Sequence, residues 1–252
     1  MPRNSAPVPV LADRIDAFWE HSGGAREHRI LPDGCMDFVF DLEHGGAWLV
    51  GAMSAAEIVQ ARPGTLFGVR FLPGAAAAYV SEAANAFVDE RIDLADVTAR
   101  AASNLAERVA TAPHRRAREG VIIQFLLDAA SRLRAPDVRV RRAASLIARA
   151  RGDIAMREVA AAANVGERQL ERLFHSHVGI APKHYARIAR LEHACRLLAE
   201  SPRPQAELAA HAGYADESHL LRDFRDLAGA TPAAIRAERH VGFVQAATVA
   251  LP

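Results

Sequence analysis

The chain has 252 residues, half of them apolar, and a formal net charge of +1. This length suits two compact domains better than one, and the apolar content excludes a wholly disordered chain. No apolar run approaches about eighteen residues and the start lacks a signal-peptide pattern, so we expect a cytoplasmic protein without a membrane span. Two cysteines, Cys35 and Cys195, have no partner motif, which argues against a disulfide framework or a structural zinc site.

The charge is divided unevenly along the chain. Residues 1–112 carry nine arginines and fifteen acidic residues, a net charge of −6. Residues 113–252 carry twenty-two basic and fifteen acidic residues, a net charge of +7. This asymmetry indicates that the second half binds a polyanion and the first half does not. Chance surface composition is the alternative.

The first half predicts a small sheet accompanied by helices. Over residues 35–42, Met36, Phe38, Phe40 and Leu42 alternate with smaller or more polar residues, which is the period-two pattern of a strand. Residues 47–53, 56–62 and 63–74 continue the series. We expect an antiparallel sheet or a barrel from about residue 28 to residue 72, with a short helix after Pro73.

The more polar face of this sheet is the candidate for a small-molecule effector pocket. If the sheet closes on itself, one of its faces lines an interior, although alternation does not say which one. The candidate pocket residues are Cys35, Asp37, Trp48 and Arg70.

The same region gives no indication of a metal site or of catalysis. Its histidines, acids and cysteine match no HExxH, paired CxxC or HxH metal pattern. No Ser/His/Asp arrangement, phosphate loop or GxGxxG motif is present, so we expect no metal, no cofactor and no enzymatic activity. A sensor-enzyme, or an alkylation- or redox-sensing regulator with Cys35 as its reactive thiol, stays open as the alternative. Asp33 and Asp37 argue against it, because they would raise the pKa of a neighbouring thiol.

From about Asp96 the pattern becomes helical. Residues 113–134 predict a helix with one apolar stripe, which either mediates dimerisation or docks onto its own domain. The stripe consists of Val121, Ile122, Phe125, Leu126, Ala129 and Leu133. The following "RAPD", residues 134–137, predicts a linker.

Two segments fifty residues apart share one phrase. "FHSHVGIAP" (174–182) and "FRDLAGATP" (224–232) both read Phe, four residues, Gly, two residues, Pro. Upstream, "VAAAANV" (159–165) aligns with "LAAHAGY" (208–214) at an offset of forty-nine, and Asn164 and Gly213 tolerate the left-handed backbone of a tight turn. Asp216 suits the N-cap of the second helix of its unit. This composition predicts two helix-turn-helix units, although a helical scaffold that does not bind DNA stays open as a further alternative.

The segment between the units predicts a rigid spacer. Residues 182–200 carry apolar side chains at helical intervals, and Pro182 suits a first helical turn. Roughly 18 residues at about 1.5 Å each give about 27 Å. With the girth of the flanking helices, this approaches the roughly 34 Å between successive major grooves on one side of DNA. One chain would therefore place two recognition helices in adjacent grooves.

Residues 137–240 resemble the DNA-binding domain of the AraC/XylS family of bacterial transcription regulators. "GYADESHLLRDFRDLAGATPAAIR" and "ERQLERLFHSHVGIAPKHYARIARLEHACRLL" carry this resemblance, which implies seven helices with two helix-turn-helix units joined by a long helix. Ala155 departs from the family, which often has Ser or Thr there, and Asp223 aligns with Leu173 and is expected to be solvent-exposed. "ILPDGCMDFVF" and "GVRFLPGA" resemble an N-terminal domain of some of these regulators, which implies an effector-binding or dimerising role.

The predicted DNA contacts lie on the second helix of each unit, at positions that match the family's base contacts. Arginine can pair with guanine through two hydrogen bonds and glutamate can accept one from cytosine. Lys183 and Arg187, with backbone amides at helix starts, are predicted phosphate contacts. Because acids repel phosphate, the acid-rich second unit is expected to bind less strongly than the first. The predicted groove contacts are Arg168, Glu171 and Arg172 in the first unit and Glu217, Ser218, His219, Leu221 and Arg222 in the second.

The sequence thus predicts an α+β N-terminal sensor domain and an all-α, seven-helix DNA-binding domain. The expected boundaries are 1–112 for the sensor, 113–136 for a helical connection and linker, 137–240 for the DNA-binding domain and 241–252 for a tail. We expect an effector-responsive transcription regulator that binds promoter DNA. Its other expected partners are a small-molecule effector, a second copy in a homodimer and, if it activates, RNA polymerase.

Overall fold

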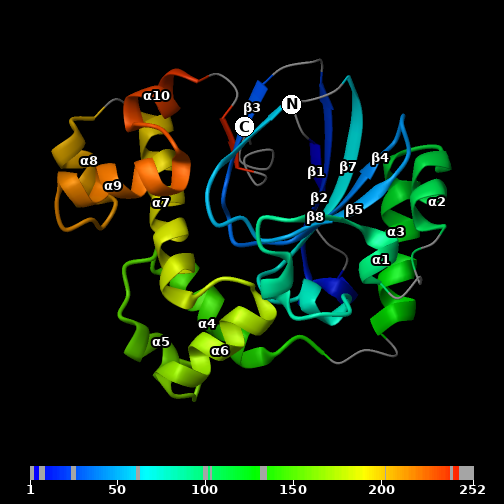
Figure 1. Cartoon of the computed structure of the whole chain (residues 1–252), viewed down its shortest axis with the longest axis horizontal. Coiled ribbons are helices and arrows are strands. Elements are labelled where there is room, and N and C mark those ends of the chain that lie inside the picture. The colour runs from blue at the N-terminus through cyan, green and yellow to red at the C-terminus, as the bar shows by residue number, and fades with distance from the viewer. Residues whose placement is uncertain are drawn as a thin grey trace.

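The computed structural model describes residues 3–5, 9–23, 27–60, 63–98, 102, 104–130, 135–201, 203–238 and 241–243. Residues 3–130 are called the sheet half below, and residues 135–238 the helical half (Figure 1). Among the described residues, no helix is both long enough and apolar enough to cross a membrane.

A six-stranded antiparallel sheet forms the centre of the sheet half, in the order β1-β2-β7-β4-β5-β8. In its middle, Phe38 lies opposite both Val69 and Leu49. A smaller sheet has the order β6-β3-β9, with β9 parallel to β3. The strands are β1 (Arg3–Ser5), β2 (Ile15–Gly23), β3 (Glu27–Leu31), β4 (Asp37–Asp41), β5 (Ala47–Val50), β6 (Glu57–Gln60), β7 (Gly64–Phe71), β8 (Arg91–Asp93) and β9 (Val241–Phe243).

The predicted alternation is confirmed for β4 and β7. Phe38, Phe40, Phe67 and Val69 are buried on one face, in a core that also contains residues of the neighbouring helices. Those helices are α1 (Leu94–Val97), α2 (Leu105–Thr111) and α3 (Arg115–Ala130), with the 3-10 turns η1 (Pro9–Leu11), η2 (Ala76–Ala78) and η3 (Ala84–Phe87). The turn η2 is the short helix expected after Pro73.

The sheet is larger than the sequence predicted, because it begins well before residue 28. Strand β2, of nine residues, pairs with β7 along nearly its whole length. A register shift between Ile15 and Ala17 interrupts the alternation, and Phe18 and Trp19 are buried although they are neighbours. A strand buried on both faces shows no period-two pattern, which explains why it was missed.

Helix α3 docks onto its own half of the molecule. Ile122, Phe125 and Leu126 are buried in the core of the sheet half, and Val121 and Ala129 pack against it. Of the two alternatives, the described part of the stripe therefore matches docking. Leu133 and Arg134, the first residue of the expected linker, lie outside the described residues.

The helical half is arranged around one long helix, α7 (Figure 1). The helices α5 and α6 lie toward one end of α7, and α8 to α10 lie toward the other. The bounds are α4 (Val138–Arg149), α5 (Met156–Ala162), α6 (Glu167–His177), α7 (Pro182–Glu200), α8 (Gln205–His211), α9 (Glu217–Ala228) and α10 (Pro232–Ala237).

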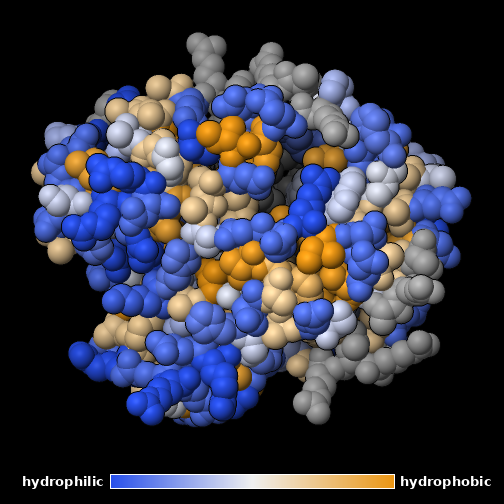
Figure 2. Space-filling model, viewed as in Figure 1, coloured by the Kyte–Doolittle hydropathy of each residue, from blue (hydrophilic) through white to orange (hydrophobic). Residues whose placement is uncertain are grey.

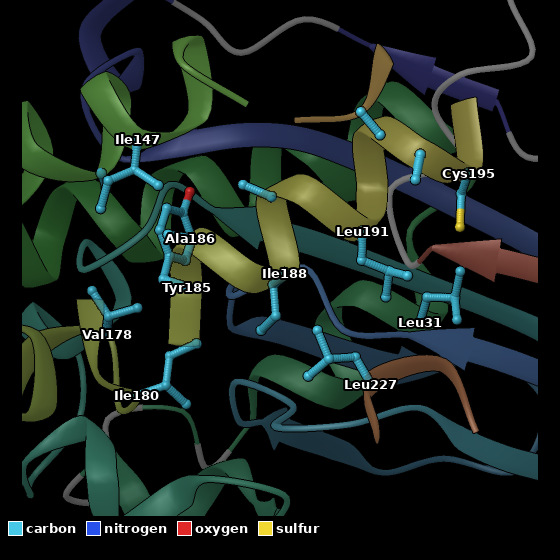
Figure 3. Close-up of a cluster of buried hydrophobic side chains, with 14 of the residues drawn as sticks. Leu31, Ile147, Val178, Ile180, Tyr185, Ala186, Ile188, Leu191, Cys195 and Leu227 are labelled. Carbon is cyan, nitrogen blue, oxygen red and sulfur yellow. The ribbon is translucent and has the colours of Figure 1, made fainter. Parts of the chain in front are cut away.

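The apolar side chains of α7 hold this half together. The apolar residues that stand at helical intervals along it are all buried: Tyr185, Ile188, Leu191, Ala194, Cys195 and Leu198. Ile188, Leu191 and Cys195 are labelled in Figure 3. Figure 3 shows them in one cluster with Leu227 of α9 and Leu31 of β3. Since Leu31 comes from the sheet half, the two halves share a hydrophobic core.

Polar contacts reinforce this junction. Arg29 of β3 forms a bidentate ion pair with Glu238, with Nε–Oε2 and Nη2–Oε1 distances of 3.0 and 3.1 Å, and donates to the carbonyl of Ala228 at 2.9 Å. The amide of Ala56 donates to the carbonyl of Leu227 at 2.7 Å. These bonds connect the small sheet to the C-terminal end of α9.

The turn before β4 also touches α7. Gly34 has a φ of +71°, and a Cβ added to it would lie 2.4 Å from the ring of Tyr185. Glycine is therefore required here both for its left-handed backbone and for the close approach to α7.

Candidate nucleic-acid interface

The helix pairs α5–α6 and α8–α9 are connected by turns with the same hydrogen bonds. In the first turn, the amide of Val165 donates to the carbonyl of Ala160 at 3.0 Å. In the second, the amide of Tyr214 donates to the carbonyl of Ala209 at 2.9 Å. The offset of forty-nine residues seen in the sequence is therefore repeated in the backbone.

The residues at the reversal have the predicted left-handed conformation. Asn164 has a φ of +55° and Gly213 a φ of +76°. Asp216 also takes its predicted role, because its Oδ1 accepts a hydrogen bond from the amide of His219 at 2.7 Å and so caps α9. Ala155 begins α5 without a side-chain cap, as its departure from Ser or Thr implies.

The repeated phrase encodes the exit from each pair. Gly179 and Gly229 follow α6 and α9 with φ values of +98° and +62°. Pro182 and Pro232 then stand in the first turns of α7 and α10. A left-handed glycine ends one helix and a proline begins the next, at the same spacing both times.

Both α6 and α9 bury one face and expose the other. Leu170 and Phe174 of α6, like Leu220 and Phe224 of α9, are at most 1% exposed. The surface over the two helix pairs is predominantly hydrophilic in Figure 2. The predicted groove contacts Arg168, Glu171, Arg172, Glu217, Ser218 and Arg222 are exposed, whereas His219 and Leu221 are half-buried.

The two predicted phosphate contacts lie in different surroundings. Lys183 is exposed at the start of α7. Arg187 is instead occupied: its Nε donates to Asp223 Oδ1 at 2.9 Å and its Nη2 to Asp226 Oδ2 at 3.0 Å. This guanidinium joins α7 to α9, so we no longer assign it to phosphate.

The expectation that Asp223 is solvent-exposed was wrong. Asp223 is 1% exposed and occupies in α9 the place that Leu173 occupies in α6. An acid at that position is tolerated because Arg187 reaches it from α7, thirty-six residues away in sequence.

This pairing changes the charge balance of the second helix pair. Asp223 and Asp226 are both engaged by Arg187, and Asp216 caps α9. Three of the acids that argued for a weaker second unit are therefore engaged within the domain, whereas the fourth, Glu217, is exposed. That the first unit binds DNA more strongly than the second therefore stays a prediction, and the charge distribution supports it less than the sequence suggested.

The four candidate effector residues lie in different surroundings. Arg70 and Asp37 are buried and face each other, with Nη2 and Oδ2 3.2 Å apart, and Trp19 Nε1 donates to Asp37 Oδ1 at 2.9 Å. Trp48 lies opposite Val39 of β4, and the guanidinium of Arg91 is 3.9 Å from its ring centroid. Of the four predicted residues, only Cys35 borders the interdomain cavity described below.

Cys35 is poorly suited to be a reactive thiol. Burial, reinforced by the negative charge of Asp33, raises the pKa of Cys35 well above its usual value. A thiol held in its protonated form is a weak nucleophile. Within the described part of the chain, no cluster of His, Cys, Asp and Glu side chains is arranged to hold a metal ion.

Comparisons with known proteins agree with this geometry. A helix-turn-helix domain model matches residues 159–238, and a model described as a domain of unknown function (DUF6597) matches residues 3–93. The HTH-type transcriptional regulator GlxA of Rhizobium meliloti is 38% identical over 74 residues, 29% of this chain and 23% of GlxA. The probable transcriptional regulator LumQ of Photobacterium leiognathi is 33% identical over 79 residues, 31% of this chain and 32% of LumQ.

A solved structure of the DNA-binding domain of AdpA, a global transcriptional factor in complex with a target DNA, is 31% identical to this chain. The similarity covers 38% of this chain and 90% of that one, with a TM-score of 0.35. This chain thus spans about a quarter to a third of the curated regulators that it matches. Residues 159–238 thus match a helix-turn-helix domain and resemble the DNA-binding part of AraC/XylS-type transcriptional regulators.

Proposed function

We propose that this protein is a sequence-specific transcription regulator that reads two adjacent major grooves with α6 and α9. In this proposal α5–α6 and α8–α9 are two helix-turn-helix units, and α4 to α10 form one DNA-binding domain over residues 137–240. The observation that carries it is the repeated turn and exit geometry with an exposed polar face on each second helix.

The length of α7 supports simultaneous binding by both units. Its 19 residues rise by about 28 Å at about 1.5 Å per residue. Both units pack against this one helix and their cores are continuous, so they are held as one body. Two preoriented recognition helices lose little freedom on binding, which favours affinity.

We assign base contacts to the exposed residues of α6 and α9. Arg168, Glu171 and Arg172 of α6 are available to base edges, and Arg222 is their counterpart on α9. Lys183, exposed at the start of α7, is assigned to phosphate.

The sheet half is proposed to be a sensor. Its direct contacts with α7, with α9 and with Glu238 at the end of α10 provide a route by which a bound effector would change the arrangement or freedom of the DNA-binding domain. Homodimer formation and contact with RNA polymerase stay expectations from the sequence.

The groove-reading proposal is tested with the purified full chain. Binding sites are selected from a random DNA library and then footprinted. We expect two protected major-groove segments about one helical turn apart on one side of the duplex, and an affinity that falls steeply with salt. One protected segment would limit the proposal to a single unit, and no specific site at all would remove it.

Arg172→Ala tests the individual assignment. This exposed substitution should leave folding unchanged, weaken binding to the selected site by about 1–3 kcal/mol and relax preference at one base pair. Fluorescence anisotropy against a panel of single-base site variants measures both effects. Arg116→Ala, which removes an exposed arginine of α3, is the matched control. Equal site preferences for Arg172→Ala and the wild type would withdraw the base contact.

A further inference from the structure

A cavity of about 640 Å³ lies between the two halves of the molecule. Asp16, Cys35, Leu72 and Pro73 line it from the sheet half, and Tyr185 lines it from α7. The remaining wall is one side of α4. A volume in this range accommodates a drug-sized molecule, and junctions between domains are common ligand sites.

The charged groups at this cavity are mostly positive. Arg141, Arg142 and Arg149 line it from α4, against a single acid, Asp16. Arg141 is partly occupied, because its Nη1 lies 3.8 Å from Asp13 Oδ2. Arg142 and Arg149 lie two helical turns apart on the same side of α4 and are exposed. Arg149 donates through Nη1 to Ser145 Oγ at 2.7 Å. An anion at the cavity would therefore meet the guanidinium of Arg142 and the remaining N–H donors of Arg149, and guanidinium groups bind carboxylates and phosphates well.

The rest of the lining is largely apolar. Leu72, Pro73, Ala144 and the ring of Tyr185 offer no charge to a ligand. A bare inorganic ion would leave these surfaces unused, whereas an anion with a hydrocarbon or aromatic body would cover them. A volume of about 640 Å³ is also too small to hold a DNA duplex.

We propose that this interdomain cavity binds a small organic anion, with its acidic group at Arg142 and Arg149 and its apolar body toward Leu72, Pro73 and Tyr185. Its role as the effector site rests on the regulatory function proposed above. Binding itself does not.

The position of Tyr185 explains how such a ligand would influence DNA reading. The Tyr185 ring borders the cavity, packs against Gly34 of the sheet half and has its centroid 5.9 Å from that of Phe174. Phe174 is the buried anchor of α6, the first proposed recognition helix. A ligand that pushes on or orders Tyr185 therefore acts one contact away from α6.

The first experiment measures binding without DNA. Isothermal titration calorimetry of the full chain is carried out with benzoate, cyclohexanecarboxylate and biphenyl-4-carboxylate as probes. The neutral amide of the carboxylate that binds most tightly is then titrated for comparison. We expect at least one carboxylate to bind saturably with one-to-one stoichiometry. The affinity for the corresponding amide should be about tenfold lower.

Substitutions then locate the site. Arg142→Ala and Arg149→Ala should each weaken the bound probe about tenfold, and Arg142→Lys should retain part of the affinity. Ala148→Trp places a bulky ring on the exposed cavity side of α4, where it should block binding without disturbing a core. Arg116→Ala, away from the cavity, should bind like the wild type. Circular dichroism verifies that each variant is folded.

The DNA measurement is kept separate. The selected operator is titrated with and without saturating probe, and we expect its affinity to change at least threefold in the wild type and not in Ala148→Trp.

The proposed site is overturned if no probe binds saturably, or if binding is unaffected by both arginine substitutions and by Ala148→Trp. Loss of DNA binding in Arg142→Ala with unchanged probe binding would reassign that arginine to phosphate. If the protein selects no operator, the groove-reading proposal fails while the calorimetry still decides whether the cavity binds anions.

Discussion

Arg70 is completely buried in the sheet half and contacts two carboxylates. Its Nη2 lies 3.2 Å from Asp37 Oδ2 and 3.3 Å from Asp33 Oδ2. One buried cation is thus shared by two acids, and the site carries more negative than positive charge if both are ionised. Burial, together with repulsion from Asp37, raises the pKa of Asp33 to about 6 in spite of Arg70.

The raised pKa of Asp33 gives stability a defined pH dependence. The unfolded carboxyl has its ordinary pKa of 3.8, so from about pH 4 to about pH 6 the folded protein holds a proton that the unfolded chain has lost. Asp33 therefore makes the free energy of unfolding fall as pH rises through this interval. Asparagine does not titrate, so Asp33→Asn should avoid this loss and raise the free energy of unfolding at neutral pH by an amount on the order of 2 kcal/mol. Weaker pairing with Arg70 should offset part of this gain.

Urea unfolding of both proteins across this pH interval measures the effect. The stability of Asp33→Asn relative to the wild type should increase from acid to neutral pH. Asp37→Asn is the contrasting variant, because it weakens the acceptor of Trp19 and should lower stability. A constant difference between Asp33→Asn and the wild type would show that Asp33 has no raised pKa.

Individual residues could be predicted from the sequence where the local backbone conformation favours a particular residue type. Asn164 and Gly213 were identified because left-handed turns select for them, and Asp216 because an N-cap needs an acceptor. Asp223 was misplaced because its burial depends on Arg187, and no local pattern indicates a partner in another helix.

Helix α5 begins without a side-chain N-cap. Ala155 occupies the N-cap with a φ of −73° and a ψ of 136°, the extended backbone that capping residues adopt, but it has no side-chain acceptor. The backbone is therefore already arranged for a serine.

Ala155→Ser should stabilise the protein by about 1 kcal/mol, because the hydroxyl can accept a hydrogen bond from an amide of the first turn of α5. Urea or thermal unfolding measures the gain. The matched control is Ala161→Ser at an exposed position inside α5, where serine offers no free amide a partner and should be neutral or slightly destabilising. Equal effects at the two positions would contradict the capping explanation.

At the scale of elements, helices with apolar residues at helical intervals were predictable and strand β2 was not. The apolar side of α7 follows from helical spacing alone, and it is buried as predicted. Strand β2 has both faces buried and a register shift, so its sequence carries no alternation. Alternation likewise placed Asp37 and Arg70 on one face but did not reveal that they form a buried ion pair.

The whole molecule is connected through Leu31. This side chain belongs to β3 yet is fully buried in the core around α7. The contact joins residues more than one hundred positions apart, so nothing in the local sequence predicted it. The two halves are therefore expected to unfold together.

Leu31→Ala tests this coupling. Removing the side chain should lower stability by about 2–5 kcal/mol. The two tryptophans, Trp19 and Trp48, both lie in the sheet half, so their fluorescence reports on that half. Far-UV circular dichroism mainly reports on the more helical half. Both transitions should coincide in the wild type and shift together in the variant.

Ile58→Ala, at a position 50% exposed on the neighbouring strand β6, is the control and should change neither transition appreciably. A shift of the dichroism transition alone would show that the halves unfold independently.

The shared core has a practical consequence for dissecting the protein. A fragment cut at residue 137 would retain every helix from α4 to α10 but lose Leu31, leaving an apolar notch open to water beside Leu191 and Cys195. Such a fragment would tend to self-associate or to bind detergent. An expression strategy that supplies the 27–31 strand in trans, or replaces the notch lining with polar residues, would suit crystallisation better than simple truncation.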